Sequence, residues 1–363
     1  MSFNGQRLTI ARQRRGHSKT SLASLLDVTA RSVSGWESGE YPPESGHIAK
    51  LVDVLAFPES FFEAGDLVAP NKDAVSFRSM TSMKAAQRDA TIAACAVANM
   101  LTDWVETKYT LPPVDVPDMR EYAPEVAAEA LRQHWRLGYR PIGHMVHLLE
   151  AKGVRVFSLS QNCVEVDACS IWLAGRPFAL LNTYKSAERS RFDAAHELGH
   201  LLLHKHGAPN GQEAEKEANT FARHFLMPVA AVRADAPRVP TLGELLRKKK
   251  TWNVSVAALA YHYWKIGVLS EWHYKSLAIE MQGRGWRTNE PEGSERERSR
   301  LWEKLFAALR QEGKGKGWLA HELSLPTSEI SELLFGLVTS SVEGIESART
   351  PPRRGHLKLV SDG

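Results

Sequence analysis

The chain of 363 residues is long enough for two or three domains with separate hydrophobic cores. Its composition, 43% hydrophobic and 24% charged, is ordinary for a globular protein. The sequence has no run of 18 apolar residues, so no membrane span is expected. The first twenty residues lack the apolar core of a signal peptide, and three cysteines without a CxxC pair argue against disulfides. We therefore expect a cytoplasmic protein that makes no membrane contact.

The basic side chains are concentrated near the N-terminus. The net charge of +4 is too small to indicate a partner. Residues 1–35, however, have a single acid, Asp27, against six bases: Arg7, Arg12, Arg14, Arg15, Lys19 and Arg31. Such an excess is typical of a surface that meets phosphates, although a solvated helix face would give the same count.

Residues 6–62 are predicted to form several short helices, because apolar side chains recur at helical spacing. The stretch "SKTSLASLLDVTARSVSGWESGEYPPE" (18–44) resembles the XRE/Cro-type helix-turn-helix repressor family. The resemblance implies a DNA-binding domain over 1–65, which would bind a double-stranded operator as a homodimer. A helical bundle that makes only protein contacts is the alternative.

Six side chains are the predicted DNA contacts of this domain. Two at the start of the first helix of the motif would meet phosphate: Lys19 and Thr20. Four on the outer face of the second helix would meet base edges: Thr29, Arg31, Ser32 and Ser34.

The middle of the chain mixes helices with a few strands. After an expected linker (63–83), we predict helices over 84–106, 124–137 and 141–153, with an extended proline-rich segment at 109–119. Strands are predicted over 154–160, 170–174 and 177–182, with a tight turn at Gly175 and Arg176, and helices over 188–204 and 212–227. We therefore expect a mainly α fold with a small antiparallel sheet, in the α+β class.

The stretch "FDAAHELGHLLLHKH" (192–206) contains the HExxH motif of zinc peptidases. His196 and His200 are one helical turn apart on the same face, so that both imidazoles can reach one ion. Glu197 lies beside them, where it can act on water. An amphipathic helix with two histidines is the alternative, but the apolar residues around the motif indicate burial against the sheet.

The third metal ligand has three candidates. His206 has metzincin spacing, but Leu203 occupies the position where that motif needs glycine. His204 lies about 6 Å further along the helix axis than His200. The following helix offers two acids on one face, and we favour Glu217 over Glu213, the second choice.

The stretches "SAERSRFDAAHELGHLLLH" (186–204) and "EKEANTFARHFLMP" (215–228) resemble the ImmA/IrrE family of metallopeptidases, over about 75–290. The resemblance implies a zincin-like peptidase domain, which we place at 75–282. It also implies zinc ligands at His196, His200 and the glutamate before Ala-Asn, Glu217, with Glu197 as acid/base. Members of the family typically cleave a helix-turn-helix repressor.

Four further residues are candidates for supporting roles. Peptide hydrolysis needs a hydrogen-bond donor that stabilises the oxyanion formed from the substrate carbonyl. Tyr261 and His262 are predicted to donate, and the alternative is that both belong to an aromatic core helix. Asn219 and Arg191 are predicted to orient the ligands.

The C-terminal part is expected to follow a hinge at 283–295. We predict a small helical region over 296–347 and a basic flexible tail over 348–363. Residues 318–338 repeat the helix-turn-helix pattern, but Glu329 and Glu332 would repel phosphate. A structural or protein-binding hairpin is therefore predicted there.

Two functions fit this sequence. The first is a DNA-binding regulator with a zinc endopeptidase that cleaves a partner, such as a repressor or antitoxin. The second is a regulator whose peptidase-like domain is a non-catalytic sensor. The intact Glu197 favours the first, because a sensor has no need of it.

Overall fold

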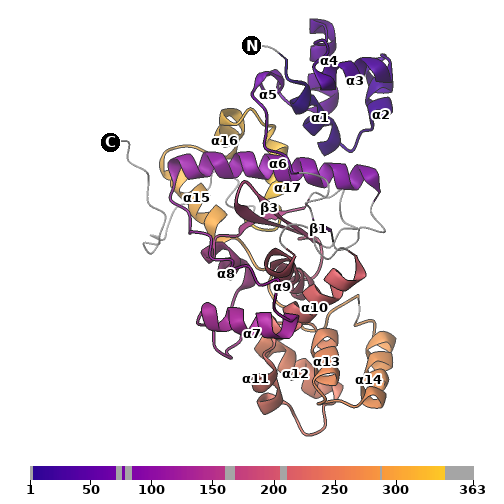
Figure 1. The fold of residues 1–363 in the computed structure, drawn as a ribbon, viewed down its shortest axis with the longest axis vertical. Coiled ribbons are helices and arrows are strands. Elements are labelled where there is room, and N and C mark those ends of the chain that lie inside the picture. The colour runs from indigo at the N-terminus through magenta and orange to yellow at the C-terminus, as the bar shows by residue number, and fades with distance from the viewer. Residues whose placement is uncertain are drawn as a thin grey trace.

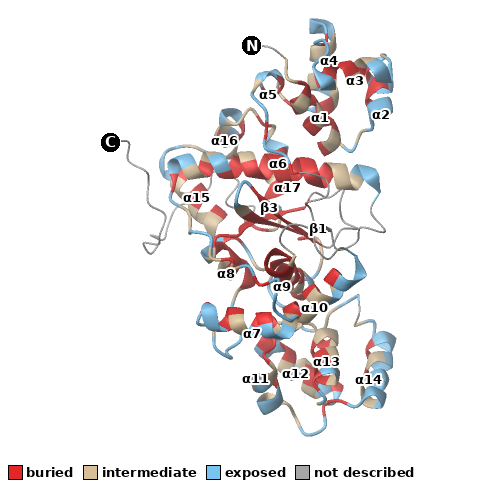
Figure 2. Ribbon diagram, in the orientation of Figure 1, coloured by how far each residue is buried: buried red, intermediate tan, exposed pale blue. Residues whose placement is uncertain are grey.

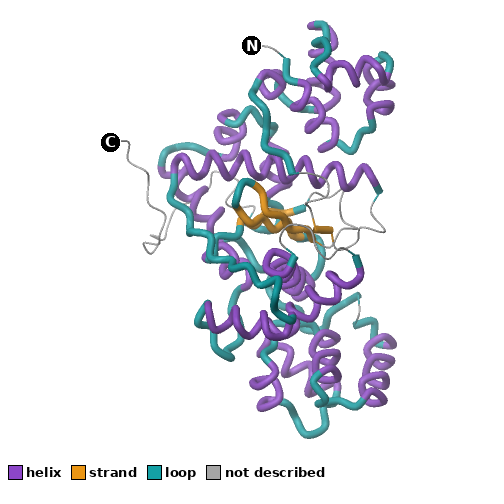
Figure 3. Tube along the Cα trace, in the orientation of Figure 1, coloured by secondary structure: helices purple, strands orange, loops and turns teal. Residues whose placement is uncertain are grey.

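The computed structural model describes residues 3–70, 76–77, 84–159, 168–204, 211–286 and 288–339. Within these ranges the molecule is mainly helical around a small sheet, as Figure 1 shows. Figure 3 shows the strands confined to the middle, with helical parts at both ends. The expected α+β class is confirmed. None of the described helices is both long and apolar enough to cross a membrane.

The N-terminal part is a bundle of short helices. Their bounds are α1 Gly5–Arg14, α2 Lys19–Leu26, α3 Ala30–Ser38, α4 Ser45–Leu55 and α5 Glu59–Glu63. Ser18 and Thr29 cap α2 and α3 by accepting backbone N–H bonds from Ser21 and Ser32, which fixes where each helix begins. A Cβ on Gly5 would lie 2.2 Å from the carbonyl oxygen of Trp36, so only glycine allows α1 to pack this closely on α3.

The described strands form one sheet in the order β1-β3-β4-β2. Their bounds are β1 Ser76–Phe77, β2 Arg155–Ser158, β3 Ala168–Leu173 and β4 Arg176–Leu181. The two-residue turn between β3 and β4 is Ala174 and Gly175, both with positive φ, rather than Gly175 and Arg176.

The sheet is mixed rather than antiparallel. β3 pairs antiparallel with both of its neighbours, whereas β2 runs parallel to β4. An alternating or apolar strand pattern indicates which faces are buried, but not the direction of the neighbouring strand. This is the reason that the predicted antiparallel pairing was wrong for β2.

The sheet separates two hydrophobic cores. On one face, side chains such as Phe157 and Phe178 pack with α6 Ala85–Lys108. On the other face, Val156 and Ala179 pack with α9 Ala187–Leu203 and α10 Gln212–Leu226. Figure 2 shows the strands and α9 as largely buried.

Six further helices complete this part of the chain. Two precede β2: α7 Pro124–His134 and α8 Met145–Ala151. Four follow α10 and pack at the end of the molecule away from α1: α11 Val229–Asp235, α12 Leu242–Trp252, α13 Val256–Lys265 and α14 Glu271–Gly283.

The C-terminal helices return to the side of the sheet that faces the N-terminal bundle. They are α15 Arg300–Gln311, α16 Lys316–Glu322 and α17 Thr327–Leu333. Leu305, Leu319 and Ile330 belong to the same buried cluster as Leu8 of α1 and Leu101 of α6. The N-terminal bundle therefore shares a continuous core with α6 and the C-terminal hairpin.

The turn that follows α17 touches the segment between β4 and α9. The hydroxyl of Thr183 donates to the backbone oxygen of Phe335 at 2.8 Å. The ring of Phe335 stacks on Tyr184 with 4.5 Å between centroids. The last described residues of the chain thus pack directly on the segment that leads into α9.

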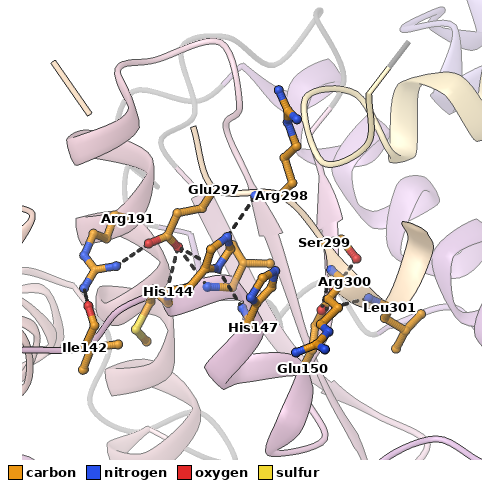
Figure 4. Close-up of polar contacts among 12 residues, drawn as sticks. Ile142, His144, His147, Glu150, Arg191, Glu297, Arg298, Ser299, Arg300 and Leu301 are labelled. Carbon is orange, nitrogen blue, oxygen red and sulfur yellow. Dashed lines mark hydrogen bonds and ion pairs between the residues drawn. The ribbon is translucent and has the colours of Figure 1, made fainter. Parts of the chain in front are cut away.

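Two glutamates connect α8 to α15, as Figure 4 shows. Glu297, just before α15, accepts N–H bonds from Met145 at 2.8 Å and Val146 at 3.0 Å, at the start of α8. Glu150 of α8 accepts N–H bonds from Arg300 at 3.0 Å and Leu301 at 3.1 Å, at the start of α15. Glu297, just before α15, thus caps α8, and Glu150, in α8, caps α15.

Candidate metal centre and DNA-contacting helix

Helix α9 is buried on nearly every side. Ser186 caps its N-terminus by accepting the backbone N–H of Arg189, and Glu188 in the first turn suits the positive end of the helix. The sheet covers one side of the helix and α10 the other. His196 and Glu197 are 0% exposed and His200 is 4% exposed.

Three side chains converge on one point between α9 and α10. The Nε2 atoms of His196 and His200 are 3.0 Å apart. One carboxylate oxygen of Glu215 lies 3.4 Å from His196 Nε2, and the other lies 3.4 Å from His200 Nε2. Among the described residues this is the group whose donor atoms could hold one metal ion. Two imidazoles and a carboxylate form the donor set of catalytic zinc sites.

The third member of the cluster is Glu215, which the sequence analysis did not consider. Glu217 instead binds His204, with 2.8 Å between Oε2 and Nε2, and exposed Glu213 pairs with Lys216 at 3.3 Å. Residues two apart point about 200° apart around a helix, so Glu215 and Glu217 cannot share a direction. The prediction of Glu217 as ligand, with Glu213 as second choice, is therefore wrong for this structure.

The packing of α10 on α9 selects Glu215. A Cβ on Gly199 would meet Phe221 Cδ1 at 3.0 Å and Ala218 Cα at 3.2 Å, so the two helices touch most closely there. The buried stripe of α10 includes Ala214, Ala218 and Phe221. Glu215 borders this stripe, three residues before Ala218, and the stripe is the sequence signal that could have identified it.

His204 and Glu217 extend the cluster outward. The Nδ1 atoms of His200 and His204 are 2.8 Å apart. One proton arrangement satisfies both contacts: His200 Nδ1 donates to His204 Nδ1, and His204 Nε2 donates to Glu217. When His200 Nε2 carries no proton, this arrangement directs its lone pair at the cluster, as a metal ligand requires. His206, the other candidate, lies outside the described residues.

The carboxyl group of Glu197 is fully buried beside the cluster. Burial raises its pKa to about 7, although the charge of His200 and a hydrogen bond from Ser170 oppose the shift. Ser170 Oγ donates to Oε2 at 2.5 Å, whereas Oε1 has no hydrogen-bond partner among the described residues. A carboxyl that titrates near neutral pH is suited to proton transfer. Ser170, a polar residue in a buried strand, was missed by the sequence analysis.

Glu215 remains ionised at neutral pH. Burial alone would raise its pKa, but hydrogen bonds and charge from His196 and His200 lower it to about 2. Two carboxyl groups in one site thus have different pKa values because their surroundings differ, and of the two it is Glu197 that titrates near pH 7.

The predicted supporting residues have diverse positions. Asn219 donates to the backbone oxygen of Glu215 at 2.7 Å, and so contacts the residue that supplies the third donor. Arg191 instead pairs with Glu297 and donates to the backbone oxygen of Ile142, as Figure 4 shows. Its predicted role in orienting a ligand was wrong, because the carboxylate of Glu297 occupies its guanidinium.

The two predicted oxyanion donors belong to α13. His262 is fully buried and bonds to the backbone oxygen of Met227 at 2.8 Å, and burial lowers its pKa to about 3. The alternative of a core residue therefore describes His262 correctly. Tyr261 lines a cleft and packs edge-to-face against Trp264 and Tyr274.

The predicted DNA contacts lie on the outer side of α2 and α3. Four are exposed, Lys19, Thr20, Thr29 and Arg31, and two are partly exposed, Ser32 and Ser34. Thr29 also caps α3, and Lys19 Nζ bonds to Ser34 Oγ at 3.0 Å. Whether these residues contact DNA stays a prediction.

The N-terminal excess of basic residues is mostly internal. Arg7, Arg12 and Arg14 are buried. Arg12 pairs with Glu37 at 2.5 Å, and Arg14 pairs with Glu329 at 2.7 Å. A phosphate-binding surface made of all six bases is excluded, since Arg7 binds the backbone oxygen of Gly65 and Arg12 and Arg14 bind acids inside the protein.

This fold and these sites define a helix-turn-helix protein with a metallopeptidase-like module. Comparison with known protein families identifies both domain types. Residues 149–263 match the family described as IrrE N-terminal-like domain, and residues 5–62 match the family described as helix-turn-helix domain. No curated protein matches the chain significantly. The chain thus combines the two domain types that its sequence resembled.

Proposed function

We propose that the chain is a DNA-binding transcription regulator with a zinc-dependent endopeptidase site. The observation that supports this most is the convergence of His196, His200 and Glu215 on one point, with the buried carboxyl of Glu197 beside it. The match to the IrrE N-terminal-like domain supports the same activity.

The donor atoms of the cluster fit zinc. Both histidines direct Nε2 into the site, and the low pKa of Glu215 keeps its carboxylate charged without a proton to displace. A zinc ion held there would supply Lewis-acid polarisation of water and of a peptide carbonyl.

Glu197 would move the proton in peptide hydrolysis. Its Oε1 takes a proton from the attacking water, whose oxygen forms a bond to the carbonyl carbon. The C–N bond then breaks, and Glu197 returns the proton to the leaving nitrogen. Ser170 holds the other oxygen of Glu197, which fixes the carboxyl plane during both transfers.

The substrate and the operator follow from the family resemblance. We propose a helix-turn-helix repressor or antitoxin as the cleaved protein, and double-stranded DNA, bound by a homodimer, as the second partner. The match over 5–62 supports DNA binding.

The test compares wild type with Glu197→Gln. Elemental analysis is expected to find about one zinc per chain in both proteins, because Glu197 is not a donor. Each protein is then incubated with a mixture of proteome-derived peptides, and new N-termini are counted by mass spectrometry. We expect cleavage products from wild type alone. Equal products from both would reject Glu197 as the base, and none from either would favour a non-catalytic sensor.

A further inference from the structure

A large cleft adjoins the metal centre but has no part in the proposed proton transfers. Its volume is about 1310 Å³, and its wall combines residues of α9, α10 and α13 with the segment before α9. Phe192 in the wall lies one turn before His196, and Asn219 lies one turn after Glu215. The volume exceeds the roughly 300–1,000 Å³ of sites for single small molecules, and so suits several residues of a peptide.

Two of the three acids of the cleft share one buried lysine. Glu188 and Glu290 both bind Lys249, at 3.3 Å and 2.8 Å, and this lysine is 1% exposed. Glu188 also accepts the N–H of Ser294, and Glu290 accepts the N–H of Val256. Both carboxylates are therefore already occupied. The third acid of the wall, Glu125, is exposed.

The bases of the cleft outnumber its acids. Five line the wall, against three acids: Lys185, Arg189, Lys216, Arg223 and Lys265. Arg189 and Lys216 have acid partners, Asp193 and Glu213, at 3.3 Å each. Of the other bases, Arg223 belongs to α10 and Lys265 to α13.

Arg223 is the most distinctive of these bases. Its guanidinium carbon lies 5.0 Å from the ring centre of Tyr261, and its Nη2 donates to Thr220 at 3.1 Å. Its Nε is buried without a hydrogen-bond partner among the described residues, and the carboxylate that acts on it electrostatically, Glu125, is exposed. Burial lowers the pKa of Arg223. A half-buried cation with spare donors is costly unless an anion completes it.

Lys265 reinforces this charge from α13. Its Nζ lies 5.5 Å from the ring centre of Tyr261 and 4.1 Å from that of Trp264. Two cations thus rest on aromatic faces at one end of the cleft. Such contacts hold cations in place without neutralising them, as carboxylates would.

We infer that the cleft recognises an acidic peptide, with a carboxylate of the peptide bound by Arg223 and supported by Lys265. The planar guanidinium can donate two parallel hydrogen bonds to a carboxylate, and Tyr261 holds it flat against the wall. The inference deepens the proposed endopeptidase function and rests on it, because it adds a preference for substrates with an acidic residue near the scissile bond. The carboxylate could belong to a side chain or to a peptide C-terminus.

The experiment measures binding in the absence of cleavage. Zinc-loaded, full-length Glu197→Gln is titrated against fluorescent ten-residue peptides, and the change in anisotropy is recorded. One peptide is rich in Asp and Glu, a second has Asn and Gln at the same positions, and both are acetylated and amidated. A third is the neutral peptide with a free C-terminal carboxylate.

The acidic amidated peptide is expected to bind about tenfold more tightly than its neutral counterpart, with a preference that weakens as salt is added. Tight binding of the third peptide alone would assign the site to a C-terminus. Equal affinity for all three would overturn the inference.

Substitutions in the same Glu197→Gln background locate the site. Arg223→Gln is expected to remove most of the preference, and Arg223→Lys to retain part of it. Arg247→Gln, an exposed arginine paired with Glu244, serves as the matched control and should change nothing. Thermal unfolding of each variant separates loss of binding from loss of fold. An unchanged preference in a folded Arg223→Gln would reject the assigned residue.

The outcome is independent of cleavage. Charge-selective binding by a chain that cleaves no peptide would support the cleft as a site for acidic peptides and reject the endopeptidase. Cleavage by wild type without a binding preference for acidic peptides would support the endopeptidase and reject the cleft as a site for acidic peptides.

Discussion

Glu215 and Glu217 are separated by one residue, yet the structure gives them different partners. Glu215 faces both histidines of the HExxH motif, whereas Glu217 reaches only His204. The motif itself could be recognised from sequence, because its two histidines belong to one helix and their spacing alone makes them neighbours. The third donor depends on how a second helix is rotated, which only the packing at Gly199 decides.

Substitution of the two glutamates distinguishes a ligand from a supporting residue. Glu215→Ala removes a donor atom and is expected to abolish tight zinc binding. Glu217→Ala should weaken zinc binding by only about 10–100-fold, because it frees His204 without removing a donor. Competition with a chromophoric chelator measures both affinities. Equal loss in the two variants would contradict the assignment of Glu215.

Arg31 is the exposed arginine on the face of α3 that we expect to meet DNA. Arg31→Ala should weaken binding by roughly 1–3 kcal/mol if the guanidinium contacts a base edge, because the truncated side chain leaves the base unpaired. Gel shifts on DNA selected by the wild-type protein from a random pool provide the measurement. Arg120→Ala, an exposed arginine outside the bundle, is the control, and unchanged affinity in Arg31→Ala would reject the proposed face.

Among the elements, the pairing of α8 with α15 makes stability depend on pH. Burial raises the pKa of Glu150 to about 7, although hydrogen bonds from Ser299 and two backbone amides oppose the shift. A carboxyl group whose pKa is higher in the folded than in the unfolded protein makes its full contribution to stability only at pH values below the unfolded pKa. The contribution is lost as the pH rises through the folded pKa.

Glu150→Gln is therefore expected to flatten the pH dependence of stability. Between about pH 4.5 and 7, wild type should lose roughly 3 kcal/mol more unfolding free energy than the variant, which cannot ionise. Urea unfolding of both zinc-loaded proteins gives the difference, and any contribution from Glu197 is common to both. Parallel pH profiles would show that Glu150 does not titrate in this range.

Helices and strands were predictable to the extent that their patterns are local. Apolar spacing identified α9 and α10, and β2, β3 and β4 all lie within or close to the predicted ranges. The direction of β2 was not predictable, because the parallel pairing of Val156 with Ala179 depends on where the chain re-enters the sheet. The two-residue β1 has too short a pattern to distinguish it from the expected linker.

In the whole molecule, an ion pair buried between the chain ends joins the N-terminal bundle to α17. Burial opposes ionisation of Glu329, but Arg14 and Arg15 outweigh it and hold its pKa below the ordinary value. The partners are 315 residues apart in sequence. Local sequence patterns predicted that the basic Arg14 would meet phosphate and that the acidic Glu329 would repel it. They could not show that these two residues bind each other.

Glu329→Gln should destabilise the protein by about 3–5 kcal/mol, because it removes the buried carboxylate that pairs with both Arg14 and Arg15 and leaves buried Arg14 with only the partly exposed Glu332. The neighbouring Glu332→Gln is the matched control. Its side chain is 36% exposed, so its loss should cost less than about 1 kcal/mol. Denaturant unfolding measures both changes, and similar values for the two would mean that the buried pair contributes no more than a surface contact.

Helix α17 and the turn after it have a consequence beyond stability, because together they touch both functional ends of the molecule. Glu329 binds the helix that packs against α3, while Phe335 stacks on Tyr184 in the wall of the cleft. Coupling free energies between two binding sites are reciprocal. A peptide that shifts Tyr184 and α17 together would therefore change the affinity for DNA by the same factor by which DNA changes the affinity for that peptide.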